Sequence, residues 1–181
     1  MKTKPKKHLP GFTLSELLVA MAVGLLVINA LWIIYLVSNK SFKSGSNKYE
    51  VAQNAKIALE KMSRELRETN EIISVLPPDA SSPADKITFR DANYAKIRYI
   101  TYHLSGTDLN RRLTHYYLSN PDDWVISTTP EATLVTDEDI PIATNLTNIK
   151  FYGQSLITIE ISGQVSSEKI DLTTNVKPRN I

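Results

Sequence analysis

Apolar side chains dominate residues 17–37, and this stretch of 21 residues contains a single clearly polar side chain, Asn29. An α-helix needs roughly 20 apolar residues to cross the hydrocarbon core of a membrane. The stretch exceeds the about 7–15 apolar residues of a secretory signal peptide, and no small-residue cleavage site follows it. The pattern therefore predicts one membrane-spanning helix near the N-terminus.

A second helical pattern follows the polar residues 38–47, where Gly45 and several serines favour a flexible joint. Apolar side chains then recur three or four residues apart, which places them on one helical face, while charge pairs spaced four residues apart occupy the opposite face. We expect one helix over residues 13–71 whose apolar face packs on the protein's own sheet; the alternative is a coiled coil with a partner helix. The apolar face comprises Ala52, Ala55, Leu59, Met62, Leu66 and Ile73.

Strand patterns replace the helical pattern after the proline-rich residues 77–83. Residues 120–147, which include Pro121, Pro130 and Pro141, show no regular pattern, and Gly163 is expected in the turn between the last two strands. A long helix followed by antiparallel strands is an α+β arrangement, with a membrane half and an amphipathic half of the helix. The expected strands are residues 86–91, 95–104, 112–118, 148–152, 157–161 and 170–176.

Charge is unevenly distributed, although the chain has 21 basic and 19 acidic residues in total. Four lysines and no acid precede Gly11, so the remainder carries a small excess of acids, which is not typical of a general nucleic-acid binder. The positive-inside rule places the lysines in the cytoplasm and the residues after the helix across the membrane. Because the chain has no cysteine, disulfides, thiolate metal sites and cysteine nucleophiles are excluded.

Glu16 lies just inside the apolar stretch, where a charged side chain costs about 2.5–3.5 kcal/mol if it enters the membrane. Residues 13–16, with the sequence TLSE, match a capping box in which Thr13 is the N-cap, and a carboxylate suits the first turn of a helix. Alternatively, Glu16 pairs with a cation inside the bilayer. No basic residue lies between Phe12 and Ser38, so that cation must come from another molecule or be a newly formed α-amino group.

The segment PGFTLSE at residues 10–16, with its lysine-rich leader and its apolar continuation, resembles the class III signal of type IV prepilins and pseudopilins. The resemblance implies that a prepilin peptidase cleaves between Gly11 and Phe12 on the cytoplasmic side, and that the new N-terminus at Phe12 is methylated. It also implies that Glu16, the fifth residue after cleavage, pairs with the N-terminal amine of a neighbouring subunit during filament assembly.

Further features support a place among the minor subunits of this family. Three segments resemble the PilW-like and J-type group. They are the helix motif SxxLR at residues 63–67, the strand RYITYHL at residues 98–104 with its return through Leu113, and the terminal VKPRN at residues 176–180. The absence of cysteine departs from pilins that close a C-terminal loop with a disulfide. Small side chains in the apolar stretch allow helices to approach closely, namely Ala20, Ala22 and Gly24.

The resemblance implies a pilin-like fold in four parts: a leader, 1–11; a transmembrane and assembly helix, 12–37; an amphipathic extension, 38–76; and a β-rich domain, 77–181. We expect a structural minor pilin or pseudopilin in a type IV pilus or type II secretion pseudopilus, near the tip. Its expected partners are the prepilin peptidase, other pilins, the inner-membrane assembly platform and the lipid bilayer. It would cross the bacterial inner membrane once, with a cytoplasmic N-terminus, before entering the filament.

Two alternatives to this function remain. Tyrosines interleave with basic residues in the strand region, and aromatic stacking with positive charge is how single-stranded nucleic acid is bound. A DNA-uptake pilin would use these cations, although tyrosine and arginine are also ordinary strand residues. A plain signal-anchored exported domain would instead keep residues 1–11. The candidate DNA contacts are Lys96, Arg98, Arg111 and Arg112.

Catalytic and metal-binding chemistry has little support in the sequence. His103 and His115 lie on neighbouring expected strands and would form a zinc site only with a carboxylate beside them, so ordinary strand residues are favoured. The acidic residues 137–139 offer oxygen ligands for calcium, but they lack EF-hand spacing and are expected to form a solvated loop. We expect no enzyme activity, no cofactor and no metal site.

Overall fold

The computed structural model describes residues 11–92 and 94–179, which belong to two compact units, Met1–Lys43 and Ser44–Ile181. The expected leader lies outside the described residues except for Gly11, as does Asn180 at the end of the VKPRN motif. One helix and eight strands are present in the described ranges, and the chain has an α+β architecture with a long N-terminal helix packed on antiparallel sheets.

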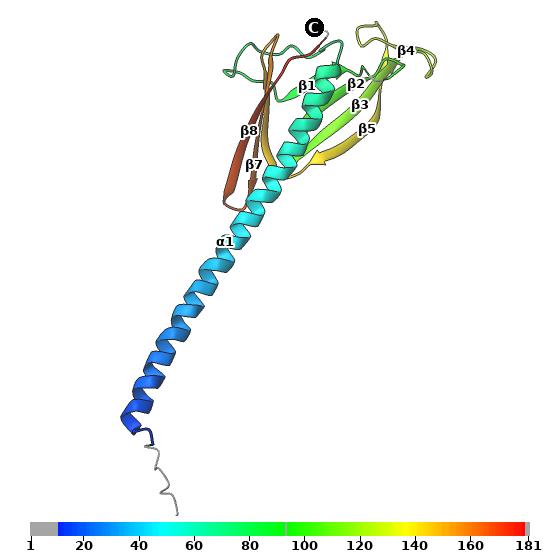
Figure 1. Ribbon diagram of the computed structural model, residues 1–181. Coiled ribbons are helices and arrows are strands. Elements are labelled where there is room, and N and C mark those ends of the chain that lie inside the picture. The colour runs from blue at the N-terminus through cyan, green and yellow to red at the C-terminus, as the bar shows by residue number, and fades with distance from the viewer. Residues whose placement is uncertain (1–10, 93, 180–181) are drawn as a thin grey trace, which may run out of the picture. The chain divides into compact units, whose positions relative to one another are not determined.

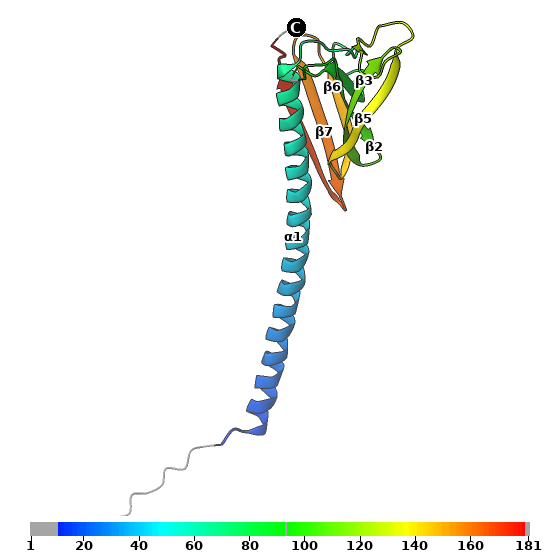
Figure 2. The same ribbon diagram turned by 90° about the vertical axis from the view of Figure 1, so that its right-hand side faces the viewer.

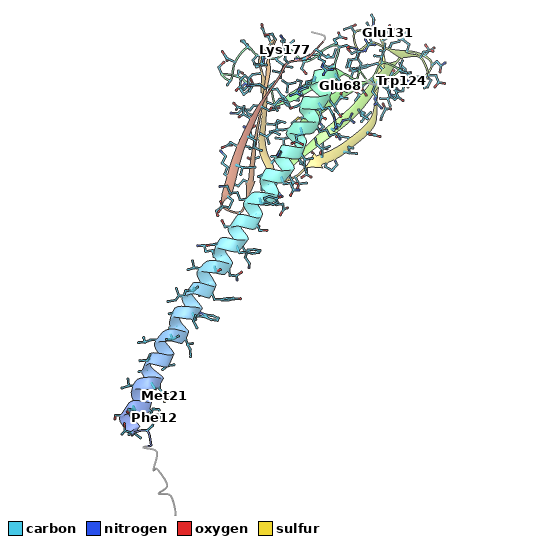
Figure 3. All side chains as sticks on the ribbon, viewed as in Figure 1. Phe12, Met21, Glu68, Trp124, Glu131 and Lys177 are labelled. Carbon is cyan, nitrogen blue, oxygen red and sulfur yellow. The ribbon has the colours of Figure 1, made fainter. Side chains whose placement is uncertain are left out.

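The first unit contains the N-terminal part of helix α1 (Leu14–Glu68). Every large apolar side chain of α1 from Leu14 to Val37 is at least half exposed, and these side chains project from the helix without covering partners (Figure 3). The amide of Asn29 donates a hydrogen bond to the carbonyl oxygen of Leu25 at 2.9 Å, so the helix itself satisfies this polar group. This part of α1 is long and apolar enough that it could span a membrane.

Residues 38–47, where the sequence favours a flexible joint, are helical and belong to α1. A Cβ at Gly45 would meet nothing within 4 Å, so no close approach requires a glycine here. A glycine in a helix interior costs about 1 kcal/mol, which a helix of this length tolerates. The boundary between the two compact units nevertheless lies beside this glycine, between Lys43 and Ser44.

The helix ends at Glu68, before the expected residue 71, because Thr69 directs the chain toward a strand. The hydroxyl of Thr69 is buried and donates to the carbonyl oxygens of Glu71 and Arg90, at 3.0 and 2.7 Å. Residues 71–74 then run along the outer edge of β1 (Lys86–Arg90), with a bridge between Ile72 and Phe89. The final part of the expected helical extension, residues 69–76, is therefore not helical.

Two antiparallel sheets replace the single sheet expected from the sequence. The larger contains β1, β2 (Tyr99–Ser105), β3 (Asp108–Tyr117), β4 (Trp124–Val125) and β5 (Thr133–Ala143), and the smaller has the order β6 (Leu146–Tyr152), β7 (Ile157–Val165), β8 (Glu168–Val176). At the centre of the larger sheet, β3 pairs with β2, β4 and β5 (Figure 1).

Strands β4 and β5 correct the expectation that residues 120–147 are irregular. Pro141 lies in β5, which pairs only with β3 and is therefore an edge strand, where a missing N–H does not interrupt the ladder. Two irregularities in the β3–β5 register also interrupt the alternation of side chains that a sequence pattern needs.

The core lies between both sheets and the C-terminal part of α1, which runs along one side of the sheets (Figure 2). The prediction that the helix packs on its own sheets is confirmed, because Ala55, Leu59, Met62 and Leu66 are buried there. Of the other expected residues, Ala52 is only partly buried and Ile73 lies beyond the helix. Sequence reasoning missed three further buried helix residues, Val51, Ala58 and Ser63.

Gly163 lies within β7 and not in the expected turn, which is made by Ser166 and Ser167. A Cβ at Gly163 would lie 2.5 Å from Cγ1 of Val51 in α1 and 3.0 Å from the carbonyl oxygen of Asn145. The close approach of helix and strand therefore requires glycine at this position.

We expect Gly163→Ala to destabilise the protein by about 1–3 kcal/mol, because the added methyl group forces the helix and β7 apart. The double variant Gly163→Ala with Val51→Ala should recover part of this loss, since it removes the clashing Cγ1 atom. Thermal unfolding of the detergent-solubilised chain, followed by circular dichroism of the β-sheets, measures both effects. Strictly additive losses would contradict a direct contact between these positions.

Candidate functional site

The N-terminal end of α1 forms the capping box that residues 13–16 suggest. The backbone N–H and the hydroxyl of Thr13 both donate to Oε2 of Glu16, at 2.9 and 2.8 Å, and the backbone N–H of Glu16 donates back to the hydroxyl at 3.3 Å. Both bonds to the carboxylate use the same oxygen, Oε2. Among the residues that the structure describes, none donates a hydrogen bond to Oε1 of Glu16.

The peptide bond between Gly11 and Phe12 precedes the helix and has no regular secondary structure. Both residues are exposed, Phe12 to 88%. A shallow apolar hollow of about 520 Å³ lies beside them, and its lining includes Phe12, Glu16, Ala20 and Val23. Glu16 thus lines a surface that is otherwise mostly apolar.

The three small residues that were expected to allow close helix packing do not share one face. Glu16, Ala20 and Gly24 follow each other at four-residue intervals and therefore lie on one side of α1. Ala22 is two residues from each of its small neighbours, which places it on the opposite side. A Cβ at Gly24 would meet nothing within 4 Å, so nothing in the described residues of this chain needs a glycine there.

The four candidate DNA-contacting cations all have partners within the second unit. Arg98 binds Asp91 at 2.6 Å, and Arg111 binds Glu65 at 3.0 Å, with all four side chains at most 20% exposed. Each pair would have to open before a nucleic-acid phosphate could replace the carboxylate.

The other two cations are more exposed but also paired. Arg112 binds Asp139 at 2.7 Å, while Lys96 lies 4.0 Å from Asp122 and 5.0 Å from the centre of the Trp124 ring. DNA contact by these residues stays a prediction, and the intramolecular pairs weigh against it.

Glu65 is the centre of a polar cluster between α1 and the larger sheet. Its carboxylate accepts hydrogen bonds from the hydroxyl of Tyr102 at 2.7 Å and from Nε of Arg111 at 3.0 Å. Burial and the adjacent carboxylate of Glu65 raise the pKa of Tyr102 far above its usual value. Burial lowers the pKa of Arg111, but its bond to Glu65 outweighs this effect and the net shift is upward. The arrangement holds the helix to the sheet through a satisfied charge.

His103 and His115 lie on neighbouring strands, but they do not face each other. His103 on β2 lies opposite Asn110 on β3. Tyr99, the first residue of β2, pairs with Thr114, and His115 is the next residue along β3. Within residues 11–92 and 94–179, no group of three or more histidine, aspartate or glutamate side chains could hold a metal ion. His103 contacts Arg112, and burial together with that positive charge lowers the pKa of His103.

The acidic residues 137–139 form part of β5 and not a solvated loop, which corrects that expectation. Asp137 accepts a bond from His115 at 2.9 Å, and Asp139 binds Arg112. Burial raises the pKa of Asp139, but hydrogen bonds from Arg112 and Asn110 outweigh this effect and hold it below its usual value.

A stack of rings holds the segment after β3 in place, and the sequence pattern did not predict this stack. Trp124 stacks on His115 with ring centres 4.1 Å apart and on Tyr94 with centres 5.6 Å apart. The guanidinium group of Arg98 lies over the ring of Tyr94, 3.8 Å from the ring centre. The one sign of this ring stack in the sequence was a tryptophan in an apparently irregular segment, and the structure half-buries it.

Comparisons with known proteins add no assignment: no protein-family model, no curated protein and no solved structure matches this chain.

We expect Tyr102→Phe to flatten the alkaline limb of the pH–stability profile. Folded Tyr102 keeps its proton above about pH 10, where an unfolded tyrosine loses it, so this group's stabilising contribution declines as pH rises. Removing the hydroxyl should reduce the slope by up to about 1.4 kcal/mol per pH unit and cost about 1 kcal/mol at neutral pH. Unfolding of the detergent-solubilised variant between pH 7 and 11 measures this, with exposed Tyr49→Phe as the control. An unchanged slope would contradict the burial of Tyr102.

Proposed function

We propose that this protein is a prepilin-like subunit, a minor pilin or pseudopilin with a pilin-like fold. In this proposal a prepilin peptidase removes residues 1–11, Phe12 is methylated, and α1 enters a filament of parallel helices. The observation that carries the proposal is the geometry of Glu16, whose carboxylate uses only Oε2 for its own helix cap and whose side chain lines a mostly apolar surface.

Charge balance supports an intermolecular role for Glu16. A carboxylate next to lipid needs a compensating charge, and the helix has no basic residue before Lys40. Cleavage before Phe12 would create an α-amino group four residues from Glu16 in each subunit. The amine of one copy would then pair with the glutamate of its neighbour, while the capping bonds of Thr13 remain in place.

The rest of the first unit is consistent with this role. Among the described residues, the large apolar side chains from Leu14 to Val37 are at least half exposed, so lipid would cover them before assembly and neighbouring helices afterwards. The side of α1 that bears Glu16 also bears Ala20 and Gly24, and small side chains permit close helix contact. The proposed location is the bacterial inner membrane, with the N-terminus in the cytoplasm and Ser44–Ile181 outside, followed by incorporation into a pilus or pseudopilus.

We expect the intact mass of the membrane-extracted protein to depend on a co-expressed prepilin peptidase. With the active peptidase, the mass should correspond to loss of Met1–Gly11 and addition of one methyl group, because the Gly11–Phe12 bond is exposed and precedes the helix. A catalytically inactive peptidase is the control and should leave the mass unchanged. Full-length protein in the presence of the active peptidase would identify an ordinary signal-anchored domain and overturn the proposal.

We expect two substitutions to separate capping from assembly. Glu16→Gln keeps a capping-box side chain but removes the charge, and should reduce incorporation into filaments about tenfold or more, since bonds to charged groups contribute about 1.5–3 kcal/mol. Thr13→Ala removes the cap at a cost of about 0.5–2 kcal/mol but leaves the carboxylate, and should assemble.

Incorporation is measured as the fraction of processed protein in sheared filaments, so a processing defect is scored separately by mass. Normal assembly of Glu16→Gln together with failure of Thr13→Ala would show that Glu16 acts only as a helix cap.

A further inference from the structure

The two sheets have four long edges, and the described residues place backbone partners on only two of them, those of β1 and β6. Residues 71–74 run along β1, where the N–H of Ile73 donates to the carbonyl oxygen of Thr88 at 2.9 Å. Ala84 exchanges two backbone hydrogen bonds with Phe151 of β6, at 3.0 and 2.8 Å. Among the backbone groups that the structure describes, none pairs with the outer edge of β5 or of β8. Uncovered strand edges are sites where further strands add.

The edge at β8 borders a groove. This groove, of about 770 Å³, lies between β8 and residues 52–68 of α1. Its apolar lining includes Leu59 and Leu172, and side chains of β8 alternate between half-buried and exposed. The helix therefore does not fully cover the inner face of β8, and one more strand beside β8 would complete that cover.

Basic side chains outnumber acidic ones in the groove, whose charged lining comprises Lys56, Arg64, Arg67, Arg179, Glu60 and Glu68. Arg64, Arg67 and Arg179 line it, and none of their guanidinium groups has a carboxylate partner among the residues that the structure describes. Lys56 also lines it but lies 4.0 Å from Glu60. Guanidinium groups bind carboxylates with paired hydrogen bonds, so this surface favours an acidic occupant.

The other uncovered edge, at β5, has the complementary charge. Residues 137–139 place three consecutive acids on this strand, and Arg112 neutralises only Asp139. Glu138 is exposed and forms no ion pair within the described part of the chain. Ile140 beside it is 43% exposed and offers an apolar side chain next to the acids. Because like charges repel, two β5 edges would not pair with each other.

We propose that the occupant of the groove is the β5 edge of a second copy of this chain. The acids of one copy would meet the arginines beside β8 of the next, and its exposed apolar side chains would lie against Leu59 and Leu172. In Figure 1, β5 and β8 lie on opposite flanks of the second unit, so each copy keeps one donor edge and one acceptor edge. Such a head-to-tail contact does not close and generates a row of subunits. The proposal deepens the proposed function, because it assigns the lateral contact within the filament.

Cysteine cross-linking tests this contact without background, because the chain has no cysteine. Ile140→Cys and Thr173→Cys are introduced on separate full-length copies with different tags, co-expressed in membranes with the peptidase, and treated with a short bismaleimide. Thr173 is exposed and lines the groove. We expect a mixed dimer at least about tenfold above the control pair Ser105→Cys and Thr173→Cys.

Charge reversal then tests the chemistry of recognition. Glu138→Lys on the Ile140→Cys copy should reduce the mixed dimer about tenfold, and Arg64→Glu on the Thr173→Cys copy should restore at least part of it. Neither residue has an ion-pair partner to lose among the described residues, so the fold should be retained.

Three outcomes would overturn the proposal: cross-linked dimers in which both copies carry the same cysteine, capture of a different protein by Thr173→Cys, or no mixed dimer in the membrane. The mass of each copy reports cleavage before Phe12 in the same sample. Uncleaved protein with a mixed dimer would reject the proposed function and keep the contact, whereas processed protein without a mixed dimer would do the reverse.

Discussion

The packing of α1 from Val51 to Leu66 on both sheets is the interaction on which the folded second unit depends. Neither sheet encloses a core alone, and the buried cluster draws residues from the helix and from strands of both. Small residues at Ala55 and Ala58, together with Gly163 on β7, let the helix approach closely. Glu65 fixes the same interface through Tyr102 and Arg111, so the helix is held by apolar contact and by a compensated charge.

The same helix has the opposite property in the first unit, where its large apolar side chains are at least half exposed among the described residues. A helix that is apolar on all sides is stable only where lipid or other helices surround it. Glu16 is costly in that setting, and the cap with Thr13 satisfies only one of its oxygens. In the proposed function, lipid or neighbouring helices would cover these side chains, and the α-amino group of another copy would pair with Glu16.

Much of the architecture was predictable because it rests on local periodicity. The apolar stretch, the buried helical face and the strands β1, β6, β7 and β8 all follow from regular spacing, and the capping box follows from four consecutive residues. Strand β5 was missed because acids and Pro141 on an edge hide the alternation that burial would impose. The ion pairs of Glu65 and Arg98 and the ring stack on Trp124 join residues distant in sequence, so no single-sequence pattern reports them.

The two proposed contacts share a physical logic. At the N-terminus, each copy would supply a carboxylate to one neighbour and an amine to another, and at the sheets each would supply an acidic edge to one neighbour and a basic groove to another. Both are heterologous, so neither is satisfied in a two-fold dimer, and both leave an unsatisfied partner at each end of a row. The covered edges of β1 and β6 limit strand addition to β5 and β8, which gives growth a direction. The acids of β5 and the arginines in the groove beside β8 have opposite charge, so β5 of one copy would be attracted to that groove and not to β5 of another copy.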